Sequence, residues 1–489
     1  MKDNETYMQY FDWYLPDDGL WWRQCAVRAP ILKHLGISGV WLPPAYKASS
    51  QDNVGYAVYD MYDLGEFDQK GTVRTKYGTK DEYLNAVKAF RKNGVKVFAD
   101  IVLNQRMGAD ETEEVTAIED AENNRNDDIS GEEQIQAWTK FTFPGRNGKY
   151  SDFTWNHDDF TGCDYDAKTG RHGVFRFKGK HWSNETDPEH GNFDYLMGAD
   201  VDWDNPEVVK QTEIWFKWYI RETHVDGLRL DAVKHIDFES YRDLLRAVRK
   251  ENEDPLPAVG EYWSGDVNRL NHYLDVVEHE MNLFDVPLHY NFYHASHSNG
   301  TYPMRNILQN TLVEQQPDYA VTFVDNHDTE PGQSLESFVD LWFKPLAYAI
   351  ILLRKDGIPC VFYSDLLGLP PQNIEPVANL ERLIFIRKLY AYGDQEDYLD
   401  DDHIIGWVRK GDEEHQDSGL AVVMTDQNGG IRRMNIGKKF AGETFRDALD
   451  KCTDPVVIDE DGWGNFETSG GNVAVWLLSE AYDEVNIYA

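Results

Sequence analysis

The sequence is poor in three features that would each have indicated a class of protein. Its four cysteines are scattered and match neither a metal-binding nor a redox spacing. No apolar run is long enough to span a bilayer. The opening residues, MKDNETYMQYFDWY, show no basic segment followed by an apolar one, so they predict no secretory signal. These absences favour free thiols in a reducing cytoplasm, or secretion only if a signal peptide has already been removed.

Basic residues are also scarce. The chain has 48 Lys and Arg against 86 Asp and Glu, which gives a net charge of −38. Such a surface repels nucleic acid and anionic membranes, so we expect neither as a partner. Two explanations of the charge remain open, namely solubility and adaptation to high salt, where self-repulsion is screened. We expect a monomer.

At 489 residues the chain is too long for one compact core, and its apolar runs indicate how it divides. Eight short, continuous apolar runs have the composition of strands buried on both faces. Helical patterns lie between many of them, for example Thr79–Asn93, which opens with a capping box, and Trp342–Asp356. Strands alternating with helices predict an α/β fold, a closed (β/α)8 barrel. The eight runs are Met8–Tyr14, Gly39–Pro43, Val95–Asn104, Val225–Asp231, Pro257–Glu261, Leu283–His289, Ala320–Asp328 and Ile358–Tyr363.

The alternation breaks twice, and each break predicts a further domain. Residues 105–205, after the third strand, are rich in Asp, Asn, Gly and Trp, and a structureless loop of that length is implausible. After about Tyr392, short strands between turn signals predict an all-β sandwich. The predicted domains are a barrel (1–104 and 206–392), an inserted domain (105–205) and a C-terminal domain (393–489). The tail strands are His403–Arg409, Leu420–Thr425, Arg432–Ile436 and Asn472–Leu478.

Three strand-like runs end in an acid, which is where a parallel barrel places its chemistry. The segments are GLRLDAVKH with Asp231, VGEYW with Glu261, and FVDNHD with Asp328. Two carboxylates that face one glycosidic bond are the minimal machinery of most glycoside hydrolases. The apolar run before Glu261 should raise its pKa, and Arg229 should hold Asp231 ionised. Any one of these acids alone could equally be a helix cap or half of a structural ion pair.

Taken together, the three segments resemble the sequence blocks of the α-amylase family. Stretches such as DLGEFDQKGTVRTKYGTK, NFDYLMGAD and WFKPLAYA extend the resemblance over nearly the whole chain, closest to bacterial liquefying and intracellular members. The resemblance implies retaining, endo-acting hydrolysis of α-1,4-glucans such as starch, glycogen or maltodextrins. It implies that Asp231 is the nucleophile, Glu261 the proton donor and Asp328 a stabiliser of the transition state. Retention would place the first two carboxyls about 5–5.5 Å apart.

The resemblance also implies a set of contacts with the sugar. Tyr56 is the best candidate to stack on the cleaved ring, and Gln105 stands where the family usually has a histidine that donates to it. A Gln in that place predicts a slowed enzyme or a changed subsite. The implied substrate contacts are Trp13, Tyr14, Tyr56, Gln105, Arg229, Lys234, His235, Trp263 and His327.

A metal site is implied as well. Clustered carboxylates in NFDYLMGADVDWD suit a hard cation, calcium above all. The ligands implied by the resemblance are Asn104, Asp194, Asp200 and the backbone carbonyl of His235. Two positions that supply acids to a neighbouring metal cluster in liquefying relatives are Thr161 and Ser183, which predicts a single ion.

Two alternative functions remain open. A transglycosylase on the same scaffold would pass the glycosyl group to a sugar instead of water, through the same covalent intermediate. A non-catalytic sugar-binding barrel is the alternative of another class, because a fold does not by itself imply an activity.

Overall fold

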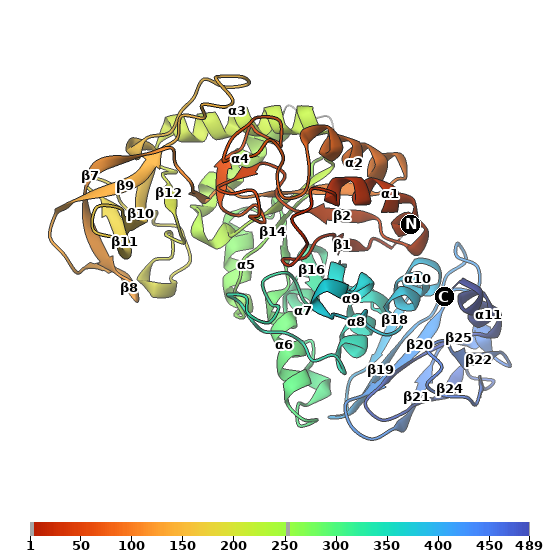
Figure 1. The fold of residues 1–489 in the computed structure, drawn as a ribbon. Coiled ribbons are helices and arrows are strands. Elements are labelled where there is room, and N and C mark those ends of the chain that lie inside the picture. Colours follow the sequence, from red (N-terminus) through yellow and green to blue (C-terminus); the bar gives the residue numbers. More distant parts are fainter. Residues whose placement is uncertain (1–3, 251–254, 489) are drawn as a thin grey trace.

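A closed barrel of parallel strands lies at the centre of the computed structural model, which describes residues 4–250 and 255–488 (Figure 1). Each of the eight predicted runs overlaps one barrel strand, and β1 pairs with both β2 and β17 to close the ring. The predicted fold is therefore confirmed. The barrel strands are β1 (Tyr7–Gln9), β2 (Gly39–Leu42), β5 (Lys96–Ile101), β13 (Gly227–Leu230), β14 (Ala258–Gly260), β15 (Asn282–Phe284), β16 (Ala320–Phe323) and β17 (Ile358–Phe362).

Helices cover the outside of the barrel, and the two predicted from sequence are present. α2 (Lys80–Lys92) has the expected capping box, in which the Thr79 backbone N–H donates to Glu82 Oε2 at 2.9 Å. In α8 (Lys344–Leu353) every residue except Pro345 is buried. The other barrel helices are α1 (Trp21–Leu35), α3 (Pro206–Thr223), α4 (Phe238–Arg249), α5 (Val267–Val276), α6 (Val286–His297), α7 (Leu312–Gln315), α9 (Tyr363–Leu367) and α10 (Leu380–Tyr390). Among the described residues, none of the helices has the length and apolar character needed to cross a bilayer.

The predicted sixth strand, Leu283–His289, is wrong in its second half. β15 ends at Phe284, and Asp285 caps the following helix by accepting a hydrogen bond from the Leu288 N–H at 3.1 Å. Pro287, which has no N–H to leave unpaired, stands in the first turn of α6. The apolar run therefore spans a strand, a cap and the start of a helix.

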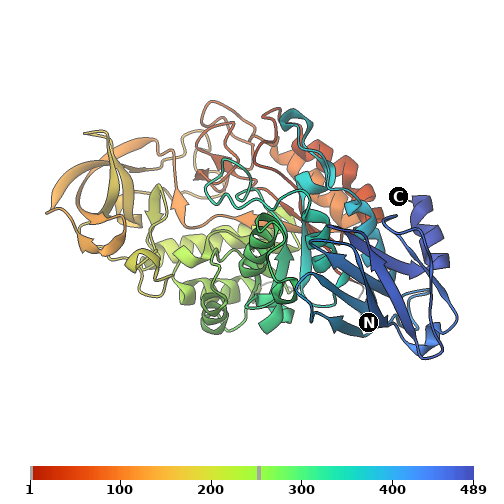
Figure 2. The same ribbon diagram turned by 90° about the horizontal axis from the view of Figure 1, so that it is seen from below.

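The segment after β5 forms a sheet of its own at one end of the barrel, as Figures 1 and 2 both show. The barrel is not interrupted by it, because β13 pairs directly with β5. The strands are β6 (Gln105–Arg106), β7 (Glu111–Ala121), β8 (Asn124–Asp128), β9 (Glu133–Lys140), β10 (Phe160–Asp166), β11 (Arg171–Phe177) and β12 (Ala199–Val201). A separate pair, β3 (Lys47–Ala48) and β4 (Val58–Asp60), belongs to the loop after β2.

The C-terminal sheets lie at the opposite end of the barrel (Figure 2). A sheet of six strands is packed against the β21–β24 ribbon, which confirms an all-β tail. Four strands of the tail, β18, β22, β23 and β24, were not predicted, and neither was its last helix, α11. The elements are β18 (Gln395–Tyr398), β19 (Ile404–Arg409), β20 (Leu420–Thr425), β21 (Gly430–Asn435), β22 (Thr444–Asp447), β23 (Val456–Val457), β24 (Trp463–Thr468), β25 (Val473–Leu478) and α11 (Ser479–Tyr488).

Candidate active site

The carboxyl ends of β5, β13 and β14 bring three acids onto one guanidinium. Arg229 Nη1 donates to Asp100 Oδ1 at 2.9 Å and to Asp231 Oδ1 at 2.5 Å. Its Nη2 donates to Glu261 Oε2 at 2.8 Å. Asp231 and Glu261 are therefore held side by side, although they are 30 residues apart in the chain. Arg229 itself is 1% exposed and lies over the ring of Trp41.

One arginine cannot neutralise three buried carboxylates. Burial raises the pKa of both Asp231 and Glu261, and the positive charge of Arg229 opposes that rise in each case. The expectation that Arg229 alone keeps Asp231 ionised is therefore too simple, because the same cation is divided among Asp100, Asp231 and Glu261. At neutral pH such a cluster favours retention of a proton by one of its acids.

The third predicted acid comes from the loop after β16 and faces the same cleft. Asp328 Oδ2 lies 3.3 Å from His327 Nε2. Burial raises the pKa of Asp328 to about 6 and lowers the pKa of His327 to about 3, so the imidazole is neutral. Gln9 fixes the other ring nitrogen through a 3.0 Å contact with Nδ1.

A stack of aromatic rings forms one wall of the site. Tyr56 lies nearly parallel to His327, with centroids 5.1 Å apart, and parallel to Trp13 at 6.2 Å. The Tyr56 hydroxyl donates to Asp100 Oδ2 at 2.8 Å, and the Trp41 indole N–H donates to the same oxygen at 2.9 Å. Asp100 thus links the aromatic wall to Arg229.

The cleft in front of these groups has a volume of about 820 Å³. Most of the predicted substrate contacts line it, whereas Arg229 and His327 lie behind it and Tyr14 is bound to the Pro331 carbonyl at 2.9 Å. Sequence reasoning did not include Tyr290, Leu335, Asp100 or Trp41 in the site. Only Asp100 had a local signal, an acid inside an apolar strand. The predicted residues that line the cleft are Trp13, Tyr56, Gln105, Asp231, Lys234, His235, Glu261, Trp263 and Asp328.

The opposite wall of the cleft is held to the inserted domain. Lys234 Nζ donates to Glu189 Oε2 at 2.9 Å and to the Trp263 carbonyl at 3.1 Å. His235 Nδ1 lies 2.7 Å from the Phe193 carbonyl, and burial lowers the pKa of His235 to about 3. The neutral ring therefore donates through Nδ1, and the inserted domain is clamped to the end of β13.

Two of the predicted metal ligands, Asp194 and Asp200, lie close enough for their charges to interact. Asn104, which follows β5, accepts a hydrogen bond from the Val201 N–H at 2.9 Å and so lies next to the strand of Asp200. Asp194 and Asp200 are 3% and 1% exposed, and the pKa of Asp200 is raised by burial and then by the charge of Asp194. Burial raises the pKa of Asp194 to about 7. Asp200 Oδ2 and Asn104 Nδ2 are buried without a hydrogen-bond partner in the described part of the chain. Two buried carboxylates that repel each other fit a hard cation.

The neighbouring acid, Asp202, has its charge balanced by a side chain of the protein. Lys180 Nζ donates to Asp202 Oδ2 at 2.5 Å, so a side chain of the protein supplies the positive charge there. The Ser183 backbone N–H donates to Asp194 Oδ2 at 3.0 Å. Within the described residues, no group of three or more His, Cys, Asp or Glu could hold a metal ion. The predicted ligand set is of another kind, since it has two carboxylates completed by amide and backbone oxygens.

A second pair of buried acids lies behind the loop that carries Asp328. Glu330 is 2% exposed and its carboxyl contacts that of Asp12, which also accepts a hydrogen bond from the Tyr14 N–H at 2.7 Å. The Lys344 ammonium, whose charge acts on Glu330, is engaged by Asp325 at 2.9 Å and Asp365 at 2.5 Å. Burial, followed by the charge of Asp12, raises the pKa of Glu330 to about 10.

Glu330→Gln is expected to change the pH dependence of stability. A carboxyl whose pKa rises on folding stabilises the fold most at low pH, and the stabilisation is lost as pH rises from about 4.5 toward 10. The variant keeps the shape without the titration. As pH increases above 5, the free energy of unfolding of the variant should therefore rise relative to that of the wild type, by up to about 1.4 kcal/mol per pH unit. Its melting temperature should rise relative to the wild type in the same direction.

Thermal melting from pH 5 to 9 measures this difference. Glu336→Gln, at an exposed position in the same loop, is the matched control and should run parallel to the wild type. A constant gap between Glu330→Gln and the wild type across that range would contradict the raised pKa of Glu330.

Comparisons with known proteins find α-amylases and their domains. The model of the α-amylase catalytic domain matches residues 26–410, and that of the α-amylase C-terminal domain matches residues 420–477. An α-amylase of Geobacillus stearothermophilus is 53% identical over 97% of this chain and 87% of its own. The α-amylase of Bacillus licheniformis is 48% identical over 97% and 93%, and the cytoplasmic α-amylase of Escherichia coli is 42% identical over 98% and 99%.

Solved structures agree on the fold. An α-amylase from Anoxybacillus superposes with a TM-score of 0.64 at 18% identity, covering 97% of each chain.

Proposed function

This chain belongs to the α-amylase family and is a glycoside hydrolase of α-1,4-glucans, and from that premise we propose that it cuts starch, glycogen or maltodextrins internally and with retention. The observation that carries the proposal is the pairing of Asp231 and Glu261 on one arginine at the floor of an open cleft. A shared guanidinium keeps the two carboxyls close, as a covalent double displacement requires.

In this mechanism Glu261 is the general acid and Asp231 the nucleophile. Glu261 donates its proton to the glycosidic oxygen while Asp231 attacks the anomeric carbon, which gives a glycosyl ester. Glu261, now ionised, takes a proton from water, and that water displaces Asp231 with a second inversion. The raised pKa values of Asp231 and Glu261 favour one retained proton in the pair, and the proposal places it on Glu261 at the start. The bond from the Ala232 N–H to Glu261 Oε2, at 3.1 Å, leaves Oε1 to carry the proton.

The remaining groups hold the sugar. Asp328, beside neutral His327, is placed to accept hydrogen bonds from ring hydroxyls as the sugar distorts. Tyr56 and Trp13 offer flat faces to the ring, a common arrangement for stacking. Lys234, His235 and Trp263 also line the cleft, and we place Lys234 and His235 on the leaving-group side.

A calcium ion would fit the pair of buried acids described above. We propose that Asn104, Asp194, Asp200 and the His235 carbonyl hold it, with the role of fixing the insert beside the cleft. The Lys180–Asp202 ion pair supports a single ion, because it occupies the adjacent acid.

The chain is proposed to work in the cytoplasm. Its four cysteines are free, and one of its relatives is named a cytoplasmic α-amylase. Free buried thiols suit a reducing compartment.

Digestion of soluble starch tests the proposed function. Internal cleavage predicts an early ladder of maltooligosaccharides and a rapid loss of iodine staining. Incubation at high maltooligosaccharide concentration separates hydrolysis from glycosyl transfer, because transfer would give products longer than the substrate. Longer products as the main outcome, or no cleavage at all, would contradict the proposal.

Gln105→His is expected to raise kcat on maltooligosaccharides by roughly ten- to hundredfold, the rate equivalent of about 1–3 kcal/mol. Gln105 Nε2 donates to the Tyr56 carbonyl at 3.1 Å, and Oε1 is buried without a partner in the described residues. Part of its donor capacity is therefore directed away from the cleft. An imidazole N–H can instead serve the sugar in the transition state.

Steady-state kinetics of the wild type and Gln105→His on the same maltooligosaccharide test this prediction. Gln105→Asn, which keeps the amide but shortens its reach, is the control and should not gain activity. Unchanged turnover in Gln105→His would show that Gln105 is already an equivalent donor.

A further inference from the structure

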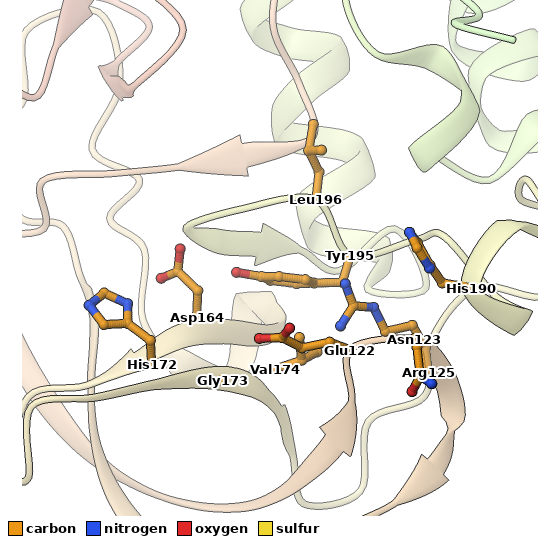
Figure 3. Close-up of a pocket in the computed structure, with 10 residues that line it drawn as sticks. All are labelled: Glu122, Asn123, Arg125, Asp164, His172, Gly173, Val174, His190, Tyr195 and Leu196. Atoms are coloured by element: carbon orange, nitrogen blue, oxygen red, sulfur yellow. The ribbon is translucent and has the colours of Figure 1, made fainter. Parts of the chain in front are cut away.

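The inserted sheet contains a second cavity of about 450 Å³, separate from the catalytic chemistry (Figure 3). Its walls come from the β7–β8 turn, β8, β10, β11 and the segment around His190 and Tyr195. In Figure 3 the Arg125 guanidinium and the Tyr195 ring lie at its centre, with His172 and His190 at opposite sides. The residues of the catalytic mechanism do not line this cavity.

Arg125 is the group that most needs a partner. Its Nε and Nη1 are buried and have no hydrogen-bond acceptor in the described part of the chain. The guanidinium lies 5.8 Å from the Tyr195 ring centroid, and burial lowers the pKa of Arg125. The side chain as a whole is half-buried, but two buried N–H groups without acceptors are costly and are usually explained by a water, ion or ligand that completes them.

The other lining groups decide which chemistry fits. Glu122 and Asp164 place two carboxylates in the same cavity as Arg125. Asp164 uses Oδ2 to accept from the Gly198 N–H at 3.1 Å, which leaves Oδ1 for a ligand. Two acids, in a chain of net charge −38, repel an anion. A neutral polyol suits the mixture, since its hydroxyls donate to carboxylates and accept from guanidinium.

The cavity borders the cleft at Leu196. Leu196 lines both, and Glu189, Phe193 and Met197 of the same segment line the cleft side. A glucan chain that extends out of the cleft past Leu196 would reach this cavity.

We propose that this cavity is an accessory site that binds a segment of α-glucan outside the catalytic cleft, with Arg125 and Asp164 as its main polar contacts. The inference rests on the proposed function, because the ligand is the polymer that the cleft cuts. It predicts two classes of substrate behaviour. Long glucans use both sites, whereas short maltooligosaccharides fill the cleft alone.

Affinity electrophoresis in gels containing soluble starch tests the site in a Glu261→Gln background, where the polymer stays intact. Arg125→Ala and Asp164→Asn, each added to that background, should weaken the apparent affinity for starch about tenfold, the value of one hydrogen bond to a charged group. Arg171→Ala is the matched control, an exposed arginine of β11 paired with Glu133, and should leave the affinity unchanged. Melting curves confirm that each variant is folded, and Arg125→Lys should recover part of the binding.

The active enzyme supplies the second readout. In the Glu261 wild-type background, Arg125→Ala and Asp164→Asn should raise KM for starch but leave kcat and KM on a short chromogenic maltooligosaccharide unchanged. If both variants bind and cut starch as their parents do, the accessory site is refuted while the proposed function stands. If the wild type does not cut starch, the proposed function fails instead.

Discussion

Glu261→Gln is expected to lower kcat on maltooligosaccharides by about 10²–10⁴-fold while KM changes little. The amide keeps the shape of the side chain and can still accept a hydrogen bond from Arg229 Nη2, which lies 2.8 Å from Oε2 in the wild type. It cannot transfer a proton to the glycosidic oxygen. The loss therefore falls on the chemical step and leaves substrate binding largely intact.

A substrate that needs no acid distinguishes the two carboxyls. Fluoride leaves without protonation, so an α-maltosyl fluoride should form the glycosyl ester at a near-normal rate in Glu261→Gln. Asp231→Asn, which lacks the nucleophile, should be inactive on both substrates. Glu189→Gln is the control, because Glu189 lines the cleft and pairs with Lys234 but has no chemical role here. Near-wild-type kcat in either Glu261→Gln or Asp231→Asn on maltooligosaccharides would overturn the assignment.

Removal of calcium is expected to lower the melting temperature substantially. An ion that binds only the folded chain at a thousand times its Kd contributes about 4 kcal/mol, and a chelator removes all of it. What remains is a pair of buried carboxyls, Asp194 and Asp200, without a counter-charge. Scanning calorimetry with calcium and with chelator measures the difference.

Asp200→Asn makes the test specific. With calcium the variant should melt below the wild type, because a ligand is lost. With chelator it should melt at or above the wild type, because the repulsion with Asp194 is gone. Asp202→Asn is the control, since Asp202 is paired with Lys180 and its replacement should shift both melting temperatures equally. The absence of any calcium response in the wild type would contradict the site.

The barrel could be predicted from the sequence because its strands are buried on both faces and so appear as continuous apolar runs. The ends of the strands and helices were harder to predict. In 283–289 the apolar pattern continues through the Asp285 cap into α6, and hydrophobicity alone cannot distinguish a strand from the first turn of a buried helix. In the tail, β22 and β24 alternate exposed and buried residues over short lengths and include charged side chains, so each gives a weak signal.

The acids of the site were visible one at a time, as carboxylates at strand ends. The way in which these acids share partners could not be predicted, because it depends on contacts between residues far apart in the chain. Asp100 is 129 residues from Arg229, yet it ties Arg229 to Tyr56 and Trp41. The balance of charge around Asp231 follows from that sharing. The hydrogen bond from Gln105 to the Tyr56 carbonyl is another contact between residues far apart in the chain.

The central claim is that Asp231 forms a covalent bond with the sugar while Glu261 handles the proton. The most direct test is mass-spectrometric peptide mapping after reaction with a fluorinated maltosyl fluoride that slows release of the glycosyl ester. The account predicts a glycosyl label on the peptide that contains Asp231, at that residue. A label on Glu261, Asp328 or any other side chain would contradict it.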